Sequence, residues 1–268
     1  MSFSADWLGL REPADHLSIN AHVRFELMQA LADRASLRVV DLGCGAGSNV
    51  RGLSAWLGPN QSWTLVDYDP KLLAAAKARL LGFGASKAVD ISYQQADLSG
   101  GEFALLIAGA DLVTAAALFD LVSVPVIDEL AASVAANGQI FSTVLSYDGI
   151  ASWLPADALD NAMRDAFNAH QHGDKGFGPA AGPGATNAIA AAFARHGYRI
   201  VRGKSPWVLD HRQAELRDQL DTGWAAAVAE TGKVPQVDID AWLARRRAAG
   251  HAAVTIVGHE DILCLPPM

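Results

Sequence analysis

The sequence predicts an α/β fold with a doubly wound, mostly parallel sheet of seven strands. Short apolar runs of strand length alternate along the chain with longer segments of helical periodicity. The first apolar run ends in a glycine-rich turn, Gly43-Cys44-Gly45-Ala46-Gly47, which is typical of a buried strand that stops at a ligand. Parallel strands need crossover connections of helical length, and the spacing of the apolar runs provides them.

The first five strands are expected before residue 147. The runs that predict them span residues 38–42, 62–66, 90–94, 112–116 and 139–146. Helices are expected between them at 49–57, 70–81 and 125–136, with Asp69 as the cap of the second and Pro70 at its first position. The run at 105–108 is a less favoured choice for strand four and also suits a connecting helix.

The pattern changes after strand five. Helices are expected at 155–169, 185–196, 210–230 and 238–249. A sixth strand is expected at 198–209, with an interruption near Pro206. The runs at 254–257 and 262–265 predict a final strand or hairpin.

An addition precedes the first strand. A helix is expected at 13–34, with an apolar arm in front of it, and such a segment can cover a ligand crevice or pack on the sheet edge. Its polar candidates for the crevice are Arg11, His16, Asn20 and His22. We expect one domain that comprises this arm (1–36), a ligand-binding half (37–147) and a decorated half (148–268) with a lid at 170–184.

Composition excludes several classes of function. The chain has 268 residues and a formal net charge of -8, without a run of Lys and Arg, so we expect no nucleic-acid partner. Its 2 cysteines, Cys44 and Cys264, lie far apart, which favours reduced thiols and a cytoplasmic protein. The N-terminus does not resemble a signal peptide, and no apolar run approaches the roughly 18 residues of a membrane span.

Acidic and glycine positions are expected to converge at one edge of the sheet. Ligands of doubly wound sheets bind outside the carboxyl ends of the strands. Asp41 and the glycine turn end strand one, Asp67 closes strand two and Asp97 follows strand three. The third glycine comes two positions after the second, which departs from the Gly-x-Gly-x-x-Gly fingerprint of dinucleotide sites, and no P-loop follows.

These motifs together resemble those of the class I S-adenosylmethionine-dependent methyltransferases, in register over about residues 38–146. The segment Asp41-Leu42-Gly43-Cys44-Gly45-Ala46-Gly47 is similar to the family motif Asp/Glu-x-Gly-x-Gly-x-Gly. The segments similar to the second strand, the turn after strand three and the fourth strand are Leu65-Val66-Asp67-Tyr68-Asp69-Pro70, Ala96-Asp97-Leu98 and Asp111-Leu112-Val113-Thr114.

The resemblance implies a Rossmann-like methyltransferase fold, S-adenosyl-L-methionine as cofactor and S-adenosyl-L-homocysteine as product. It implies that Asp67 accepts hydrogen bonds from the ribose hydroxyls and that Asp97 accepts one from the adenine amino group. It also implies that Asp41 orients the ammonium end of the cofactor. The cofactor-binding residues expected are Asp41, Gly43, Cys44, Gly45, Gly47, Asp67, Tyr68, Asp97, Leu98 and Thr114.

The reaction implied is an in-line displacement at the sulfonium methyl carbon by an O or N nucleophile. The motifs of nucleic-acid amino methylation and of cytosine C5 methylation are absent after strand four. Paired acids for magnesium-dependent catechol methylation are not evident. Together with the net negative charge of the chain, these absences favour a small-molecule acceptor and a reaction without a metal.

Acceptor-side residues are expected from the N-terminal arm and from the segments after strands four and five. Asp120 closely follows strand four, and His170 and His172 lie between glycines in the lid segment. An imidazole is the side chain best suited to take a proton near pH 7. These three residues are the catalytic candidates, and a solvated surface loop is the alternative for the two histidines.

Other functions stay open at this point. A non-catalytic protein that binds the cofactor could use the same fold. A protein or peptide methyltransferase is a further alternative, favoured by a wide, open groove, whereas the glycine spacing argues against a nicotinamide-dependent oxidoreductase. The sequence does not decide the acceptor, or between a monomer and a homodimer.

Overall fold

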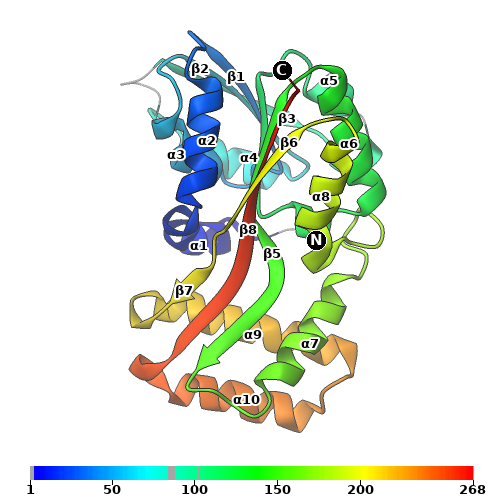
Figure 1. Cartoon of the computed structure of the whole chain (residues 1–268). Coiled ribbons are helices and arrows are strands. Elements are labelled where there is room, and N and C mark those ends of the chain that lie inside the picture. The colour runs from blue at the N-terminus through cyan, green and yellow to red at the C-terminus, as the bar shows by residue number, and fades with distance from the viewer. Residues whose placement is uncertain (1–2, 84–87, 102, 268) are drawn as a thin grey trace.

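A single sheet passes through the whole molecule (Figure 1). The computed structural model describes residues 3–83, 88–101 and 103–267. Its strands are β1 (Leu37–Leu42), β2 (Gln61–Asp67), β3 (Val89–Gln95), β4 (Leu112–Ala116), β5 (Ile140–Leu154), β6 (Arg199–Lys204), β7 (Trp207–Leu209) and β8 (Val254–Leu265). They are ordered β3-β2-β1-β4-β5-β8-β6, and β7 pairs with β8 outside this path.

The strand directions bring the predicted site residues to one edge. The neighbours from β3 to β5 are parallel, whereas β8 is antiparallel to both β5 and β6. Residues 112–115 of β4 are all buried, because helices cover both faces of the sheet. The predicted class, a doubly wound and mostly parallel α/β sheet, is confirmed.

Helices form a layer on each face of the sheet. They are α1 (Ala5–Ser18), α2 (Ala21–Leu31), α3 (Ser48–Leu53), α4 (Pro70–Arg79), α5 (Phe103–Leu106), α6 (Val124–Ala136), α7 (Asp160–Gln171), α8 (Ala185–Ala194), α9 (Ala214–Thr231) and α10 (Gln236–Ala248). On one face, α2, α3 and α4 pack around Val39, Trp63 and Leu65. On the other face, α5, α6 and α8 pack around Phe141.

A third hydrophobic cluster lies where β5 and β8 continue beyond the rest of the sheet, in the lower part of Figure 1. The two strands pair from Phe141↔Cys264 to Leu154↔Val254, with two irregularities in register. The helices α7, α9 and α10 cover this extension, and Trp153 packs edge-on against Trp224 and Trp242.

Strand five therefore extends beyond its expected end at residue 146. Asp148-Gly149 has the composition of a turn, but Gly149 has φ +85° within an irregular stretch of β5, and the strand continues to Leu154. The runs at 254–257 and 262–265 are one strand rather than a hairpin. Strand six divides into β6 and β7 on either side of Pro206, close to the expected interruption.

The N-terminal segment forms two helices where one was expected. Asn20 breaks the helix, because its Oδ1 accepts hydrogen bonds from the N–H groups of His22 at 3.0 Å and Val23 at 3.1 Å and so caps α2. Pro13 lies inside α1 rather than in its first turn. The apolar residues before Pro13 are part of α1. This helix crosses the edge of the sheet at which the parallel strands end.

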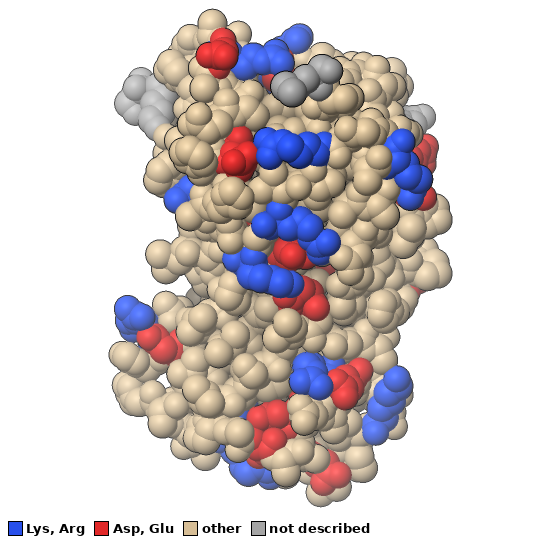
Figure 2. All heavy atoms as spheres, in the orientation of Figure 1, with Lys and Arg blue, Asp and Glu red and all other residues tan. Residues whose placement is uncertain are grey.

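Charged side chains are mixed on the surface. Figure 2 shows Lys and Arg beside Asp and Glu on the face that it presents. Among the described residues on that face, no continuous basic stripe is visible. Ion pairs such as Arg195–Asp128 and Arg199–Glu26 account for part of this mixing.

Candidate active site

The glycine loop turns sharply at the carboxyl end of β1. Gly43, Gly45 and Gly47 have φ angles of +63°, +52° and +77°, in the left-handed region that glycine adopts without strain. The N–H of Cys44 donates to the carbonyl of Val66 at 3.0 Å, which fixes the loop to the end of β2. The loop backbone is therefore held at the edge of the sheet where the strand ends meet.

Asp41 is fully buried beneath this loop. Asn49 Nδ2 donates to Asp41 Oδ1 at 2.8 Å, whereas Oδ2 is buried without a hydrogen-bond partner among the described residues. Burial raises the pKa of Asp41 to about 7, the hydrogen bond from Asn49 opposes the shift and the charge of Asp67 adds to it. A buried acceptor of this kind would be satisfied by a cationic or N–H-bearing ligand group.

Asp67 closes β2 beside the same loop. Its Oδ2 accepts a hydrogen bond from Gly45 N–H at 2.9 Å, and its Oδ1 accepts one from Asp69 N–H at 3.0 Å. Burial raises the pKa of Asp67, and these backbone hydrogen bonds oppose the rise. Each carboxylate oxygen has more than one lone pair, so the group can accept further hydrogen bonds from a ligand.

The third predicted acid, Asp97, follows β3. Its Oδ1 accepts hydrogen bonds from Ser99 Oγ at 2.7 Å and Ser99 N–H at 2.8 Å, and these bonds hold the pKa of Asp97 below its ordinary value. Leu98 is buried next to it, and Tyr68 is 49% exposed after Asp67. Asp67, Tyr68, Asp97 and Leu98 line one pocket together with Asp41.

Two expected cofactor residues lie behind the pocket lining. Gly47 is the N-cap of α3, and a Cβ on it would lie 2.7 Å from Leu80 Cδ1. Thr114 is buried in β4 and accepts a hydrogen bond from Asn49 Nδ2 at 3.2 Å. Asn49 thus links Thr114 to Asp41 and also lines the pocket. In the sequence, only its position in the first turn after the glycine loop could have indicated this role.

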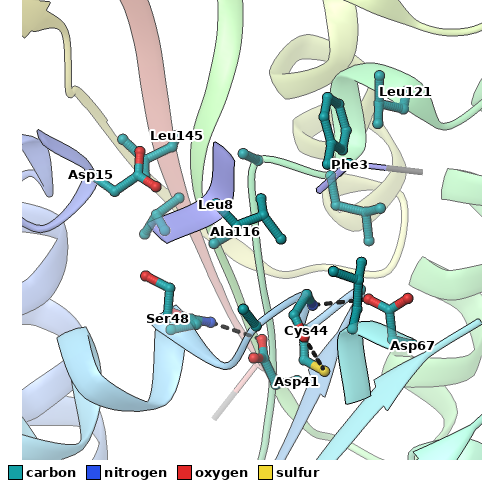
Figure 3. A pocket seen from close by; sticks show the side chains of 18 of the residues that line it. Phe3, Leu8, Asp15, Asp41, Cys44, Ser48, Asp67, Ala116, Leu121 and Leu145 are labelled. Carbon is teal, nitrogen blue, oxygen red and sulfur yellow. Dashed lines mark hydrogen bonds between the residues drawn. The ribbon is translucent and has the colours of Figure 1, made fainter. Parts of the chain in front are cut away.

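The pocket has a volume of about 290 Å³ and lies between the strand ends and α1 (Figure 3). Figure 3 shows Asp41, Cys44 and Asp67 along one side, with Phe3, Leu8 and Leu121 across from them. The lining also includes Arg11, Asp15, His16 and Ile19, residues 116–118, Val144 and Leu145, and residues 175–177.

Two lining residues hold a strained backbone. Ala117 has φ +50° and Leu145 has φ +60°, which is unfavourable for residues with a Cβ. The buried carboxylate of Asp261 holds Leu145 in place, because Oδ1 accepts hydrogen bonds from Leu145 N–H at 2.8 Å and Ser205 Oγ at 2.5 Å. Strain of this kind is characteristic of functional sites.

Helix α1 is bound to elements on both sides of the pocket. Glu12 pairs with Arg51 through two contacts of 2.6 Å. His16 Nε2 lies 3.0 Å from Ser48 Oγ, and Trp207 Nε1 donates to Asp15 Oδ1 at 3.1 Å. These contacts make α1 a fixed wall of the pocket.

The four polar candidates of the N-terminal segment separate into two pairs. Arg11 and His16 line the pocket. Asn20 caps α2 and donates through Nδ2 to the carbonyl of Lys204 at 2.9 Å, and His22 is exposed. The sequence could not distinguish these pairs, because the break between α1 and α2 decides which side chains face inward.

The structure places the two candidate histidines outside the pocket lining. His170 Nε2 lies 2.9 Å from Glu230 Oε2, and its Nδ1 lies 3.3 Å from Lys175 Nζ. His172 Nδ1 lies 3.4 Å from the carbonyl oxygen of Ala180. Their catalytic role stays a prediction, and in this structure their rings contact other parts of the protein.

Asp120, the third catalytic candidate, lies in the turn Phe119–Leu121 and directly precedes the lining residue Leu121. Its Oδ1 is buried without a hydrogen-bond partner in the described part of the chain. Burial raises the pKa of Asp120 to about 6, and the charge of Arg11 opposes the rise. Asp120 is therefore behind the wall of the pocket, close enough to Arg11 for their charges to interact.

The glycine-rich segment reaches the pocket through residues 175–177. Asp174 Oδ1 accepts hydrogen bonds from the N–H groups of Gly176 at 2.7 Å and Gly178 at 3.1 Å, which closes a tight loop. Lys175 and Phe177 are thereby presented to the cavity.

Three further features concern metals, membranes and thiols. In residues 3–83, 88–101 and 103–267, no group of three or more His, Cys, Asp or Glu side chains could hold a metal ion. No described helix has both the length and the apolar character to cross a bilayer. Cys44 and Cys264 are free, and burial raises the pKa of both thiols.

Comparison with known proteins identifies the cofactor-facing half. Residues 39–138 match a family model described as a methyltransferase domain. The fold is similar to that of the YcgJ protein from Bacillus subtilis (TM-score 0.52, 12% identity, 93% of this chain and 100% of that chain). It is also similar to a candidate methyltransferase from Bacillus halodurans (TM-score 0.51, 14% identity, 91% and 97%).

A methyltransferase from Geobacter sulfurreducens in complex with S-adenosyl-L-homocysteine superposes with a TM-score of 0.45 at 19% identity, over 93% of this chain and 92% of that chain. No curated protein sequence matches the chain.

The segment that matches the family model contains the glycine loop and the acids at the ends of β1, β2 and β3. This match identifies residues 39–138 as a methyltransferase domain, and the sheet order described above is that of the fold shared with the solved structures. The match supports the family and the cofactor that the sequence motifs indicated.

Proposed function

We propose that the protein transfers the methyl group of S-adenosyl-L-methionine to a small-molecule acceptor bound in the pocket under α1. The observation that carries the proposal is the buried, unpartnered Oδ2 of Asp41 in the same pocket as the carboxylate of Asp67. A ligand with an ammonium group and a ribose diol would satisfy both acids.

Individual residues fit the parts of this cofactor. We assign Asp67 to the ribose hydroxyls and Asp97, with the backbone N–H of Leu98, to the adenine. We assign Asp41 to the ammonium group. The loop lacks room for side chains, because a Cβ on Gly43 would lie 3.0 Å from Leu118 Cδ1 and one on Gly45 would lie 2.9 Å from Leu8 Cδ1. The glycines therefore fit a close approach of the backbone to the methionine part.

When bound, the cofactor supplies a methyl group that is already activated by the sulfonium. The protein then has to position the acceptor in line and exclude water. Helix α1 and residues 175–177 supply walls for both tasks. If the acceptor carries a proton, Asp120, His170 and His172 stay the candidates for removing it, and the proposed reaction uses no metal.

The shape of the pocket supports a small acceptor. The helix α1 lies across the strand ends and is held there by the Glu12–Arg51 ion pair. Apolar residues from three different segments, among them Leu121, Leu145 and Phe177, also line the pocket. A protein or peptide substrate would need an open groove at this place.

Calorimetric titration with S-adenosyl-L-homocysteine tests the proposal. We expect Asp67→Ala to weaken binding by about 1.5–3 kcal/mol, because charged hydrogen bonds to the ligand are lost. Asp90 is an exposed acid at the opposite end of the sheet, so Asp90→Ala should leave the affinity unchanged. A wild-type protein that does not bind this ligand would contradict the proposed function.

A further inference from the structure

We propose that the methyl acceptor is an amphiphilic acid, with an apolar body and one anionic group that pairs with Lys175. This inference rests on the proposed function and adds the chemical class of the substrate. It depends on the charges and the apolar side chains among the residues that line the pocket.

Lys175 brings a positive charge to the pocket that no carboxylate balances. Among the described residues, no carboxylate oxygen lies within the 4.0 Å of an ion pair with its ammonium group, although the residue lines the cavity. Its polar contact is with His170 Nδ1 at 3.3 Å. An ammonium group can only donate, so Nδ1 accepts, and His170 Nε2 can donate to Glu230 at 2.9 Å. Glu230 thus contacts the histidine and leaves the lysine available.

Asp15, another acid in the pocket lining, is already paired. The guanidinium of Arg11 donates to both oxygens of Asp15 over 2.9–3.2 Å, and Trp207 Nε1 donates to Oδ1. Asp15 therefore balances Arg11 and does not offset Lys175. A cationic acceptor would meet an uncompensated like charge here, whereas an anionic acceptor would meet an opposite one.

Much of the remaining lining is apolar. It includes Phe3, Ile19, Leu118, Leu121, Leu145 and Phe177. An anion without an apolar body would leave these side chains facing water, so the site fits a ligand in which both features are combined. Phe177 follows Lys175 by two residues in the same tight loop, and this brings an apolar and a cationic contact together.

The anionic group could belong to the acceptor or to the methionine carboxylate of the cofactor. Both are carboxylate-like anions, and the experiment must separate them. We assign Lys175 to the acceptor, because it belongs to the loop at residues 175–177, whereas the cofactor acids follow β1, β2 and β3.

The test uses two fluorescent probes of similar apolar size, with the protein first saturated with S-adenosyl-L-homocysteine. The anionic probe is 8-anilinonaphthalene-1-sulfonate, and the neutral one is N-phenyl-1-naphthylamine. We expect Lys175→Met to weaken the binding of the anionic probe about tenfold and to leave the affinity for the neutral probe unchanged. Lys175→Arg should retain most of the affinity, and Lys233→Met, at an exposed lysine between α9 and α10, serves as the control.

The outcomes separate the two proposals. Failure of the wild-type protein to bind S-adenosyl-L-homocysteine overturns the proposed function itself. If that ligand binds but the anionic probe does not, or if both probes respond equally to Lys175→Met, the acidic acceptor is overturned. A loss of affinity for S-adenosyl-L-homocysteine alone would assign Lys175 to the cofactor carboxylate and would also overturn the inference.

Discussion

At the scale of single residues, Asp41 shows how strongly burial controls this site. Its ordinary pKa of 3.8 rises to about 7 in the folded protein. Between these two values the folded chain keeps a proton that the unfolded chain has lost. The contribution of Asp41 to stability therefore falls as the pH rises through this window, and above it the ionised carboxylate is held at a constant cost.

A bound ammonium group should instead favour the ionised form of Asp41. We predict that the affinity for S-adenosyl-L-homocysteine rises up to about eightfold from pH 6 to pH 7.5, because the ionised form of Asp41 becomes populated. Calorimetry at the two pH values measures this directly. Asp41→Asn should remove most of the pH dependence, whereas Asp90→Asn should not. A flat profile in the wild-type protein would rule out the contact between Asp41 and the ammonium group.

The sequence identified the acids of this pocket but missed several of its other residues. Asp41, Asp67 and Asp97 follow strands whose carboxyl ends must meet in a parallel sheet, so local pattern and topology were sufficient. Arg11 and Lys175 reach the same cavity from segments far away in the chain. Their positions depend on how α1 and the loop at 175–177 pack, and no local periodicity encodes that packing.

At the scale of elements, the junction between α1 and α2 decides which side chains face the pocket. Asn20 caps α2, donates to the carbonyl of Lys204 and, through its own N–H, donates to Asp261 Oδ2 at 2.7 Å. Gly203 of β6 leaves the space that this side chain fills, and a Cβ there would collide with it. The break between α1 and α2 therefore depends on the space that Gly203 leaves in the edge strand β6.

We predict that Gly203→Ala lowers the free energy of unfolding by about 1–2 kcal/mol, because Asn20 loses its capping position. Gly223 provides the matched control, since it is exposed inside α9 and a Cβ there meets nothing within 4 Å. Gly223→Ala should raise the free energy of unfolding by about 0.5–1 kcal/mol through helix propensity. Urea denaturation measures both, and equal effects of the two substitutions would disprove the steric argument.

Strand and helix ends were the least predictable part of the elements. The cores of β1, β2 and β4 agree with their apolar runs, because burial on both faces imposes a continuous pattern. The edge strand β3 also lies where it was expected, although most of its residues are not buried. The extension of β5 was missed because Asp148-Gly149 locally favours a turn. Pairing with β8 overrides that preference, and the partner lies about a hundred residues later in the chain.

At the scale of the whole molecule, two strands join three hydrophobic clusters. β5 and β8 contribute Phe141 and Ile262 to the core on one face and Ile140 and Leu263 to the core on the other face. They also contribute Tyr147 and Val257 to the cluster around the tryptophans. Their hydrogen-bonded ladder has no linker between these regions. We therefore keep the prediction of one domain, although the helices after β5 have a core of their own.

This prediction can be tested by unfolding. Four of the chain's 7 tryptophans, Trp153, Trp207, Trp224 and Trp242, lie in the third cluster, so intrinsic fluorescence mainly reports that region. Far-ultraviolet circular dichroism reports helices throughout the chain. We expect the two urea transitions to coincide, and S-adenosyl-L-homocysteine to shift both midpoints equally. A fluorescence transition that precedes the other and ignores the ligand would indicate two independent units.

The walls of the pocket come from different stretches of the chain, and this has an evolutionary consequence. The cofactor acids lie inside the segment that matches the family, whereas Arg11, Leu145 and Lys175 lie outside it. Substitutions at these outer positions leave the hydrogen bonds of Asp41 and Asp67 intact. Under the proposed function, point changes at these outer positions would therefore alter the choice of acceptor in descendants of this chain, and the residues assigned to the cofactor would stay the same.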